Sequence, residues 1–276
     1  MLTRDVEEFA ARAEGFLAER VERNVLATVL GHVRSGRFDV SRSLFACCLD
    51  EREQVRAAAM RTLPWPLLAC DFDATTAELL VERWLVEDPS VSGVNAQPQT
   101  ARAVAAAWSR HTGGTSRCSM REAMHLLSEV TDVPRLAVGH LRLATDEERE
   151  LLTAWERAFV LEAGTGVMEE AGRSVEARLT IGAQHVWENG GPVCTLVLSA
   201  AIAGTVRIGP VYTPPEHRRR GYAGSAVAAA CRHAFALGAR QCMLFTDLAN
   251  PTSNRIYASV GFRRCGEWEE YRFAIA

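Results

Sequence analysis

Lysine is absent from this sequence of 276 residues, and all 31 of its cationic residues are arginine. Together with the abundance of alanine, this indicates the codon bias of a GC-rich bacterial genome. No apolar run reaches the roughly 18 residues that a membrane-spanning helix needs, and the first residues contain acids and no apolar signal core. We therefore expect a cytoplasmic bacterial protein without a membrane partner.

Patterns typical of metal, nucleotide and nucleophile sites are also missing. The eight cysteines form no Cys-x-x-Cys pair, and no His/Cys cluster has the spacing of zinc ligands, so we expect no metal. The patterns Gly-x-x-x-x-Gly-Lys, Gly-x-Gly-x-x-Gly, Gly-x-Ser-x-Gly and His-Glu-x-x-His do not occur. The formal net charge of −3 argues against nonspecific nucleic-acid binding.

With 48% hydrophobic residues, the chain is globular and long enough for two domains. In the first half, apolar spacing predicts helical structure over 3–33, hairpin strands over 44–49 and 54–60, a strand over 67–70, a helix over 75–86 capped by Thr75 or Thr76, a strand over 91–95 and a helix over 98–111. Residues 119–130 fit a strand or a helix, and residues 132–135 have the composition of a linker.

The second half gives a clearer pattern. It predicts a strand over 141–145, a helix over 146–162 capped by Asp146, a helix over 167–181, strands over 184–188 and 193–199 around Asn189-Gly-Gly, a strand over 203–212, a helix over 221–237, a strand over 242–246, a helix from Asn250 to Gly261, and one or two final strands. This order predicts an α/β fold with a mixed central sheet flanked by helices. We expect domains at 1–134 and 135–276, the first a degenerate version of the second. In the first, we take 94–101 as the counterpart of the arginine-rich turn described next.

The most informative segment runs from Tyr212 to Gly224 and reads Tyr-Thr-Pro-Pro-Glu-His-Arg-Arg-Arg-Gly-Tyr-Ala-Gly. It joins an alternating, strand-like run to an alanine-rich helical run. Glycine at a helix start lets backbone N–H groups approach an anion, and the helix N-terminus adds about half a positive charge there. The segment therefore predicts a diphosphate-binding turn.

A second segment, Asn250-Pro-Thr-Ser-Asn-Arg-Ile-Tyr257, leads to Gly261-Phe262. From about residue 139 onward, the two segments in this order resemble the GNAT superfamily of N-acetyltransferases, whose Arg/Gln-x-x-Gly-x-Gly/Ala motif corresponds to Arg218–Ala223. The resemblance implies a GNAT-like fold and acetyl-CoA as co-substrate. The first half resembles the degenerate partner domain of two-domain members.

The resemblance also implies roles for single residues. Val211, Tyr212 and Thr213 would contact the pantetheine and the acetyl carbonyl through backbone atoms. The diphosphate would be held by Arg219, Arg220, Gly221, Tyr222, Ala223 and Gly224, and the ribose phosphate by Arg218 or Arg219. Asn250 and Asn254 would cap the helix or contact the cofactor.

Acetyl transfer to an amine requires a donor to the developing oxyanion and a proton for the departing thiolate. The resemblance places the oxyanion donor at the backbone N–H near Val211. We expect Tyr257 to be the acid, with a core tyrosine as the alternative. The base stays open among Glu162, Glu188, Glu216, Glu267, His185 and a water chain.

We therefore expect an N-acetyltransferase that moves acetyl from acetyl-CoA to a primary amine by direct attack, as a monomer or homodimer. A non-catalytic acyl-CoA sensor is one alternative. A transferase for longer acyl chains, with room beside Ala223 and Ala226, is another. The acceptor stays open among a small amine or antibiotic, a peptide N-terminus and a protein lysine.

Overall fold

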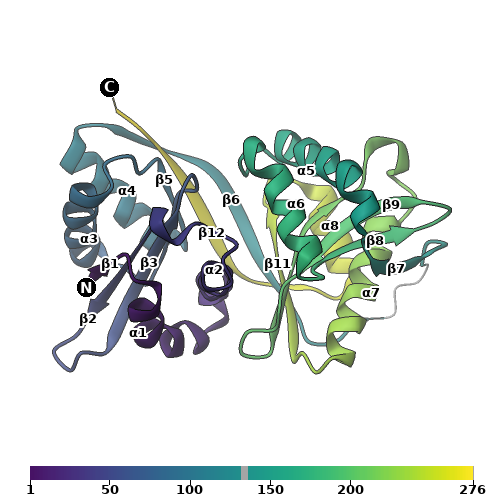
Figure 1. Ribbon diagram of the computed structural model, residues 1–276, viewed down its shortest axis with the longest axis horizontal. Coiled ribbons are helices and arrows are strands. Elements are labelled where there is room, and N and C mark those ends of the chain that lie inside the picture. The colour runs from purple at the N-terminus through teal and green to yellow at the C-terminus, as the bar shows by residue number, and fades with distance from the viewer. Residues whose placement is uncertain (132–135, 276) are drawn as a thin grey trace. The chain divides into compact units, whose positions relative to one another are not determined.

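The computed structural model describes residues 1–131 and 136–275, and one order of elements occurs in it twice (Figure 1). In each half of the chain, one strand is followed by two helices, three strands, a helix, a strand, a helix and a last strand. The first series comprises β1 (Leu2–Thr3), α1 (Val6–Ala18), α2 (Asn24–Arg34), β2 (Ser43–Leu49), β3 (Val55–Thr62), β4 (Leu67–Cys70), α3 (Ala74–Glu87), β5 (Gly93–Ala96), α4 (Pro98–Thr112) and β6 (Thr115–Leu127).

The second series comprises β7 (His140–Leu143), α5 (Arg149–Ala163), α6 (Ala171–Thr180), β8 (Gln184–Glu188), β9 (Pro192–Leu198), β10 (Thr205–Tyr212), α7 (Tyr222–Ala236), β11 (Gln241–Asp247), α8 (Pro251–Val260) and β12 (Arg263–Ala274). Short 3₁₀ turns precede α5 and α6 at Asp146–Glu148 and Met168–Glu170, and another lies at Pro215–His217. The predicted mixed α/β fold is therefore confirmed. Residues 119–130, left open in the sequence, contribute to strand β6.

The repeat corrects one prediction. The counterpart of the arginine-rich turn is the connection between β4 and α3, which is residues 71–73, and not 94–101. The latter segment corresponds to the connection between β11 and α8. In both of these connections a proline, Pro98 or Pro251, occupies the first helical position, where its missing N–H costs no hydrogen bond.

Two predicted helix caps are also wrong. Asp73 caps α3, because its side chain accepts from Thr76 N at 2.8 Å while the Thr76 hydroxyl accepts from Asp73 N. Thr145 caps the 3₁₀ turn before α5 in the same manner, with Glu148 as its partner. In both cases the cap lies before the residue predicted, because a cap needs an extended backbone and the predicted residues already belong to the first turn.

The chain divides into two units. Unit 1 is Met1–Ala123 with Gly266–Ala276, and unit 2 is Met124–Cys265. The predicted domain 135–276 includes the last strand, whereas Glu269 to Arg272 of β12 pair with β5 inside unit 1. The predicted linker, 132–135, lies outside the described residues.

In unit 1, β2, β3 and β4 pair antiparallel, β4 pairs parallel with β5, and β5 pairs antiparallel with β12. Helices α3 and α4 pack on one face around Trp84 and Trp108. Helix α1 lies on strands β2 and β3, where the rings of Phe9 and Phe45 stack at 5.1 Å. Each face of this sheet is thus covered, which explains the continuous apolar runs in its strands.

Unit 2 has the same design. Strands β7, β8, β9 and β10 pair antiparallel in sequence order, and β10 pairs parallel with β11. Helices α7 and α8 pack on one face around Cys194, Leu196 and Leu244. Helices α5 and α6 pack around Trp155 and Val186.

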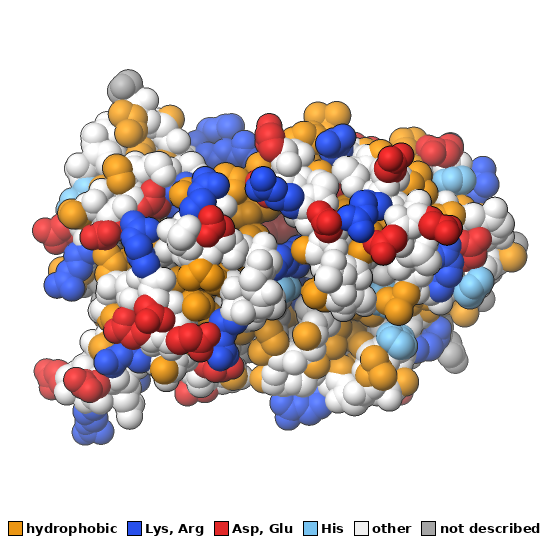
Figure 2. Space-filling view, viewed as in Figure 1, with side chains coloured by type: hydrophobic (Ala, Val, Ile, Leu, Met, Phe, Trp, Pro, Cys, Tyr) orange, Lys and Arg blue, Asp and Glu red, His pale blue; other side chains and the backbone are white. Residues whose placement is uncertain are grey.

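On the face drawn in Figure 2, arginine and carboxylate side chains are interspersed. Many form exposed ion pairs, such as Arg34 with Glu7 and Arg149 with Glu176, each of which contributes at most about 1 kcal/mol to stability. In the part of the chain that the structure describes, no helix has the length and apolarity to cross a bilayer.

Strand β6 begins in unit 1 and ends in unit 2, where Leu127 is buried in the hydrophobic core beside Gly261, at the end of α8. We expect Leu127→Ala to lower the free energy of unfolding by about 2–5 kcal/mol, because it leaves a cavity in the core of unit 2. Denaturant unfolding measures this loss, with Leu161→Ala on α5 as the control, since Leu161 is 76% exposed. Equal effects of the two substitutions would contradict the assignment of β6 to this core.

Candidate active site

Strands β10 and β11 separate along their length. Their parallel pairing runs from Thr205 opposite Gln241 to Arg207 opposite Met243 and ends there, although both strands continue. At that point β10 has a bulge: Ile208 pairs with Leu198 and Val211 with Leu196, so three steps along β10 correspond to two along β9. Among the described residues, the backbone of β10 from Ile208 onward therefore has no pairing with β11. The N–H of Val211, which the resemblance makes the oxyanion donor, lies in this part.

The connection from β10 to α7 holds two residues with left-handed backbone, Arg219 with φ of 62° and Gly221 with φ of 81°. Gly221 is the N-cap of α7 and has no side chain to accept a hydrogen bond. The first N–H groups of an α-helix have no intrahelical acceptor, so they stay available to a ligand here. A Cβ on Gly221 would find its nearest atom 3.8 Å away, so φ rather than space selects glycine. This is the geometry of an anion site at a helix N-terminus.

The three arginines of the turn differ in their surroundings. Arg218 donates through Nε to the carbonyl oxygen of Thr213 at 2.9 Å and through Nη2 to Glu162 Oε2 at 2.6 Å. Arg219 and Arg220 are exposed, with no such partner among the described residues. The sequence did not indicate this difference, because Glu162 lies 56 residues before Arg218.

The start of α7 is anchored on both sides. The Tyr222 hydroxyl accepts from Asn189 Nδ2 at 2.8 Å, in the hairpin between β8 and β9. Gly224 faces Ile256 of α8, and a Cβ there would lie 3.6 Å from that side chain. Ala223, between them, is partly buried against the core of unit 2. These contacts hold the turn against the rest of unit 2.

Asn250 and Asn254 both hold the start of α8. Asn250 Oδ1 accepts from Ser253 N at 3.1 Å, as the predicted cap. The Asn254 amide donates to the carbonyl oxygens of Asp247 and Asn250 at 3.1 and 2.8 Å. Its Oδ1 accepts from the Thr246 hydroxyl at 2.6 Å. Both amide hydrogens of Asn254 are thus used within the chain.

This network includes a residue that the sequence did not single out, His125 of β6. Its Nε2 lies 3.1 Å from Thr246 Oγ1, and because the Thr246 hydrogen goes to Asn254, His125 Nε2 must donate. Burial and the charge of Arg264 lower the pKa of His125, so the ring is neutral at pH 7. No sequence signal could reveal this pairing, since the two residues are 121 positions apart.

Tyr257 lies on α8 one turn after Asn254 and is 8% exposed. Its ring packs edge-on against Phe262 at 6.1 Å, and its hydroxyl has no hydrogen-bond partner among the described residues. Burial, and to a smaller extent the nearby Cys194, raises the pKa of Tyr257. The phenol therefore stays protonated, as a proton donor must.

The predicted bases have different environments. The carboxylate of Glu162 accepts from Tyr212 and Arg218, and that of Glu188 accepts from Arg142 at 2.7 Å. His185 is buried against the carbonyl of Ala183, and burial lowers its pKa. Glu216 is exposed in the 3₁₀ turn after Pro214, and Glu267 belongs to unit 1.

The corresponding region of unit 1 has a different chemistry. Strands β4 and β5 stay paired from Leu67 opposite Val94 to Ala69 opposite Ala96. At the N-terminus of α3, the carboxylate of Asp73 already accepts a backbone N–H. The preceding Asp71 is ion-paired with Arg23 at 2.7 Å. Two carboxylates thus occupy the turn where unit 2 has arginines.

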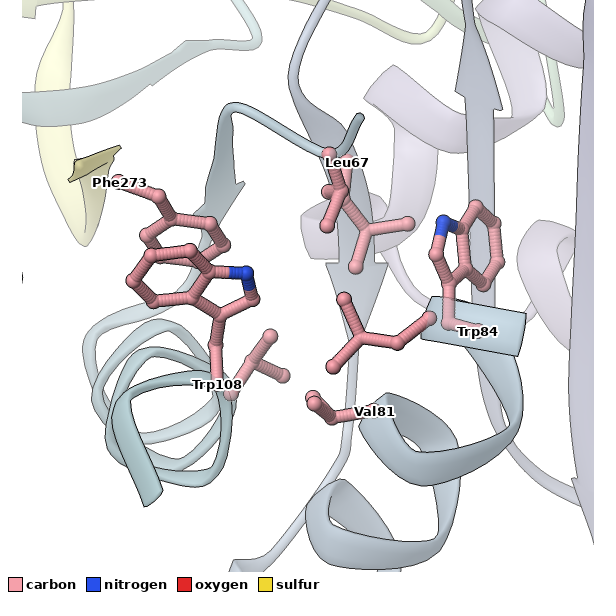
Figure 3. Close-up of a pocket in the computed structure, with 8 residues that line it drawn as sticks. Leu67, Val81, Trp84, Trp108 and Phe273 are labelled. Carbon is pink, nitrogen blue, oxygen red and sulfur yellow. The ribbon is translucent and has the colours of Figure 1, made fainter. Parts of the chain in front are cut away.

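Unit 1 contains a small pocket, but away from this turn (Figure 3). Figure 3 shows Trp108 stacked on Phe273 at one side and Trp84 at the other. Its lining is apolar and comes from α3, α4, Leu67 at the start of β4, Val91 and Phe273 of β12. We interpret it as a packing gap in the core, because it has neither cation nor helix N-terminus for a diphosphate.

Comparison with known proteins places this geometry in a family context. The family model described as the acetyltransferase (GNAT) family matches residues 138–262. No curated protein matches the chain.

Three solved structures are similar over nearly the whole chain. An acetyltransferase of the GNAT family from Colwellia psychrerythraea has 10% identity and a TM-score of 0.62, covering 100% of this chain and 99% of that one. A GCN5-related N-acetyltransferase from Sphaerobacter thermophilus has 13% identity and a TM-score of 0.59, covering 98% and 91%. A tandem GNAT protein from the clavulanic acid biosynthesis pathway has 14% identity and a TM-score of 0.59, covering 99% and 98%. These likenesses confirm the predicted fold, including an N-terminal region of similar fold.

Proposed function

Residues 138–262 belong to the GNAT acetyltransferase family, and from this premise we propose that unit 2 transfers an acetyl group from acetyl-CoA to a primary amine by direct attack. One observation carries the proposal: the separation of β10 from β11 leads directly to the uncapped helix N-terminus at Gly221. An extended thioester with a diphosphate at one end fits such an opening followed by an anion site.

In this proposal the cofactor lies along β10. The backbone of Val211, Tyr212 and Thr213 pairs with pantetheine in place of β11, and the Val211 N–H polarises the acetyl carbonyl. The N–H groups from Arg219 to Gly224 bind the diphosphate. Arg219 and Arg220 supply charge from the solvent side. Because Arg218 is bound to Glu162, we assign the ribose phosphate to Arg219. Asn250 and Asn254 act by fixing the start of α8.

The reaction moves one proton off the amine and one onto sulfur. For an amine with a pKa near 10, the neutral form at pH 7 lies about 3 pK units, or roughly 4 kcal/mol, above the protonated form. We propose that solvent removes this proton, because Glu162 and Glu188 are engaged with arginines and His185 is buried. Tyr257 then donates its proton to the departing thiolate of CoA.

Unit 1 is non-catalytic in this proposal. Its paired β4 and β5 leave no opening, and a diphosphate at α3 would meet the carboxylates of Asp71 and Asp73. We therefore expect calorimetry to give one acetyl-CoA site per chain. Asp73→Asn should leave that number unchanged, because asparagine caps α3 equally well. Two sites per chain would show that unit 1 binds cofactor too.

The proposed function is tested by measuring thiol release from acetyl-CoA against a panel of acceptors: small amines, aminoglycoside antibiotics, peptides with a free N-terminus and lysine-containing proteins. Release that depends on one acceptor class supports the transferase and names the class. Tight binding of acetyl-CoA without release from any acceptor would instead favour the acyl-CoA sensor. Absence of binding would remove the cofactor assignment altogether.

A further inference from the structure

Three side chains of unit 2 form a closed cluster beside the arginine-rich turn over 213–221, the proposed diphosphate site, which we call the diphosphate turn. The Tyr212 hydroxyl donates to Glu162 Oε1 at 2.9 Å, and Arg218 Nη2 donates to Glu162 Oε2 at 2.6 Å. Arg218 Nε donates to the Thr213 carbonyl, and its guanidinium lies 5.7 Å from the centre of the Tyr212 ring. Each oxygen of Glu162 thus has its own donor, and Arg218 is held from two directions.

The cluster joins segments that are distant in sequence. Tyr212 is the last residue of β10, and Arg218 opens the turn that leads to Gly221. Glu162 is the penultimate residue of α5, which ends at Gly164 in a left-handed conformation and continues through the connection to α6. One carboxylate therefore connects the diphosphate turn to the connection between α5 and α6.

Positioning explains this arrangement better than stability does. The side chains of Glu162 and Arg218 are 44% and 42% exposed, and an ion pair so exposed adds little to folding. The buried anchor is Tyr212, which is 6% exposed and packs edge-on against Phe159 of α5. The rigid ring fixes where Glu162 lies, and Glu162 in turn fixes the guanidinium of Arg218.

Charge gives the cluster a second consequence. An unpaired carboxylate this close to the turn would repel a diphosphate, and Arg218 neutralises it. Arg218 thereby serves Glu162, while Arg219, Arg220 and the backbone N–H groups stay free for phosphate.

We propose that Glu162 is a positioning residue that, through Arg218 and Tyr212, couples occupation of the diphosphate turn to the order of the connection between α5 and α6. The proposal rests on the proposed function, since it requires CoA to bind at this turn. It excludes Glu162 as the catalytic base. It also means that cofactor binding prepares a segment outside the cofactor site itself.

Hydrogen exchange with CoA as the probe tests this coupling without knowledge of the acceptor. In the wild-type chain, we expect CoA to slow amide exchange over 213–224 and also over 160–170. In Glu162→Gln at saturating CoA, the first segment should stay protected and the second should lose its protection. The glutamine still accepts from Tyr212, so the charge pairing alone is removed. Glu150→Gln, an exposed carboxylate at the other end of α5, is the matched control and should behave as wild type.

Affinities give an independent readout. Glu162→Gln removes the coupling to 160–170, which weakens CoA binding, but leaves the Arg218 cation unpaired beside the diphosphate, which strengthens it, so we expect its affinity to stay within about fivefold of wild type. Arg218→Ala should weaken it about tenfold, because it leaves the carboxylate unpaired beside the diphosphate. The double variant should bind better than Arg218→Ala alone, since the repelling charge is gone.

The outcomes separate the two hypotheses. If the wild-type chain binds CoA but 160–170 is not protected, or if Glu162→Gln keeps that protection, the coupling is wrong and the proposed function stands. A double variant that binds no better than Arg218→Ala would likewise overturn the role of Glu162. If the wild-type chain binds no CoA, the proposed function fails, and the coupling fails with it.

Discussion

Gly221→Glu should abolish acetyl-CoA binding, with a loss of affinity of at least about 100-fold, while the protein stays folded. The new carboxylate would occupy the N-terminus of α7, where the proposed diphosphate meets the free N–H groups, and two anions cannot share that site. Non-glycine residues at a left-handed φ cost about 1–2 kcal/mol. An acid at a helix N-terminus returns about 0.3–1 kcal/mol of this, so little folding free energy is lost. Calorimetry with acetyl-CoA measures the affinity.

The chain offers a matched control at the other end of the same helix. Gly238 also has a left-handed backbone, with φ of 93°, and a Cβ there would meet no atom within 4 Å. Gly238→Glu therefore introduces the same backbone strain and the same charge, at a helix end where an acid is unfavourable. It should destabilise the protein at least as much as Gly221→Glu and leave acetyl-CoA affinity unchanged. If both variants lose affinity equally, the loss reflects damage to α7, and the diphosphate assignment is wrong.

The turn itself was predictable because its determinants are local. Two prolines follow the end of β10, a glycine with left-handed φ precedes α7, and Pro251 begins α8. Each is a residue whose backbone preference is independent of tertiary context. The strands on either side follow from alternation and from the Asn189-Gly-Gly hairpin. Elements of this kind place the candidate cofactor residues without knowledge of the fold.

What could not be predicted depends on contacts between distant residues. The segment 119–130 has no decisive period, and β6 becomes a strand through its hydrogen-bonded neighbours β12 and β11, which follow it by more than 100 positions in the sequence. The sequence misplaces the unit 1 counterpart of the arginine-rich turn. Residues 71–73 correspond to that turn only by their place in the order of elements and contain none of its residue types. Arg218 looked equivalent to its two neighbours until Glu162 and Tyr212 came beside it.

The repeat also explains why we propose a single site in this chain. Both halves have the same order of elements, so both have a strand end followed by a helix N-terminus. In unit 2 the strands separate and the helix is uncapped; in unit 1 the strands stay paired and Asp73 fills the cap. A capping carboxylate stabilises a helix by about 1 kcal/mol and occupies the place of an external anion. We therefore expect Asp73 both to stabilise α3 and to keep an external anion away from its N-terminus.

Tyr257→Phe should lower kcat about 100-fold and change the affinity for acetyl-CoA less than about twofold. General acid catalysis contributes typically about 10²–10⁴-fold, and phenylalanine keeps the ring that packs against Phe262. Because burial raises the pKa of Tyr257 above its ordinary value of about 10, the phenol stays protonated throughout the neutral range. A raised pKa means that the group favours the folded state below pH 10 and that this contribution is lost as pH rises further.

The level of the rate, and not the shape of its pH profile, separates an acid from a merely packed tyrosine. The wild-type rate should rise from pH 6 to pH 9 as the acceptor amine loses its proton, with no fall from Tyr257 in that range. Tyr257→Phe should show the same rise at a lower level, since the amine and not the phenol titrates. Tyr271→Phe on β12 of unit 1 is the control and should keep the wild-type kcat. If Tyr257→Phe also keeps it, the thiolate takes its proton from solvent, and Tyr257 is a core residue whose buried hydroxyl has no part in the reaction.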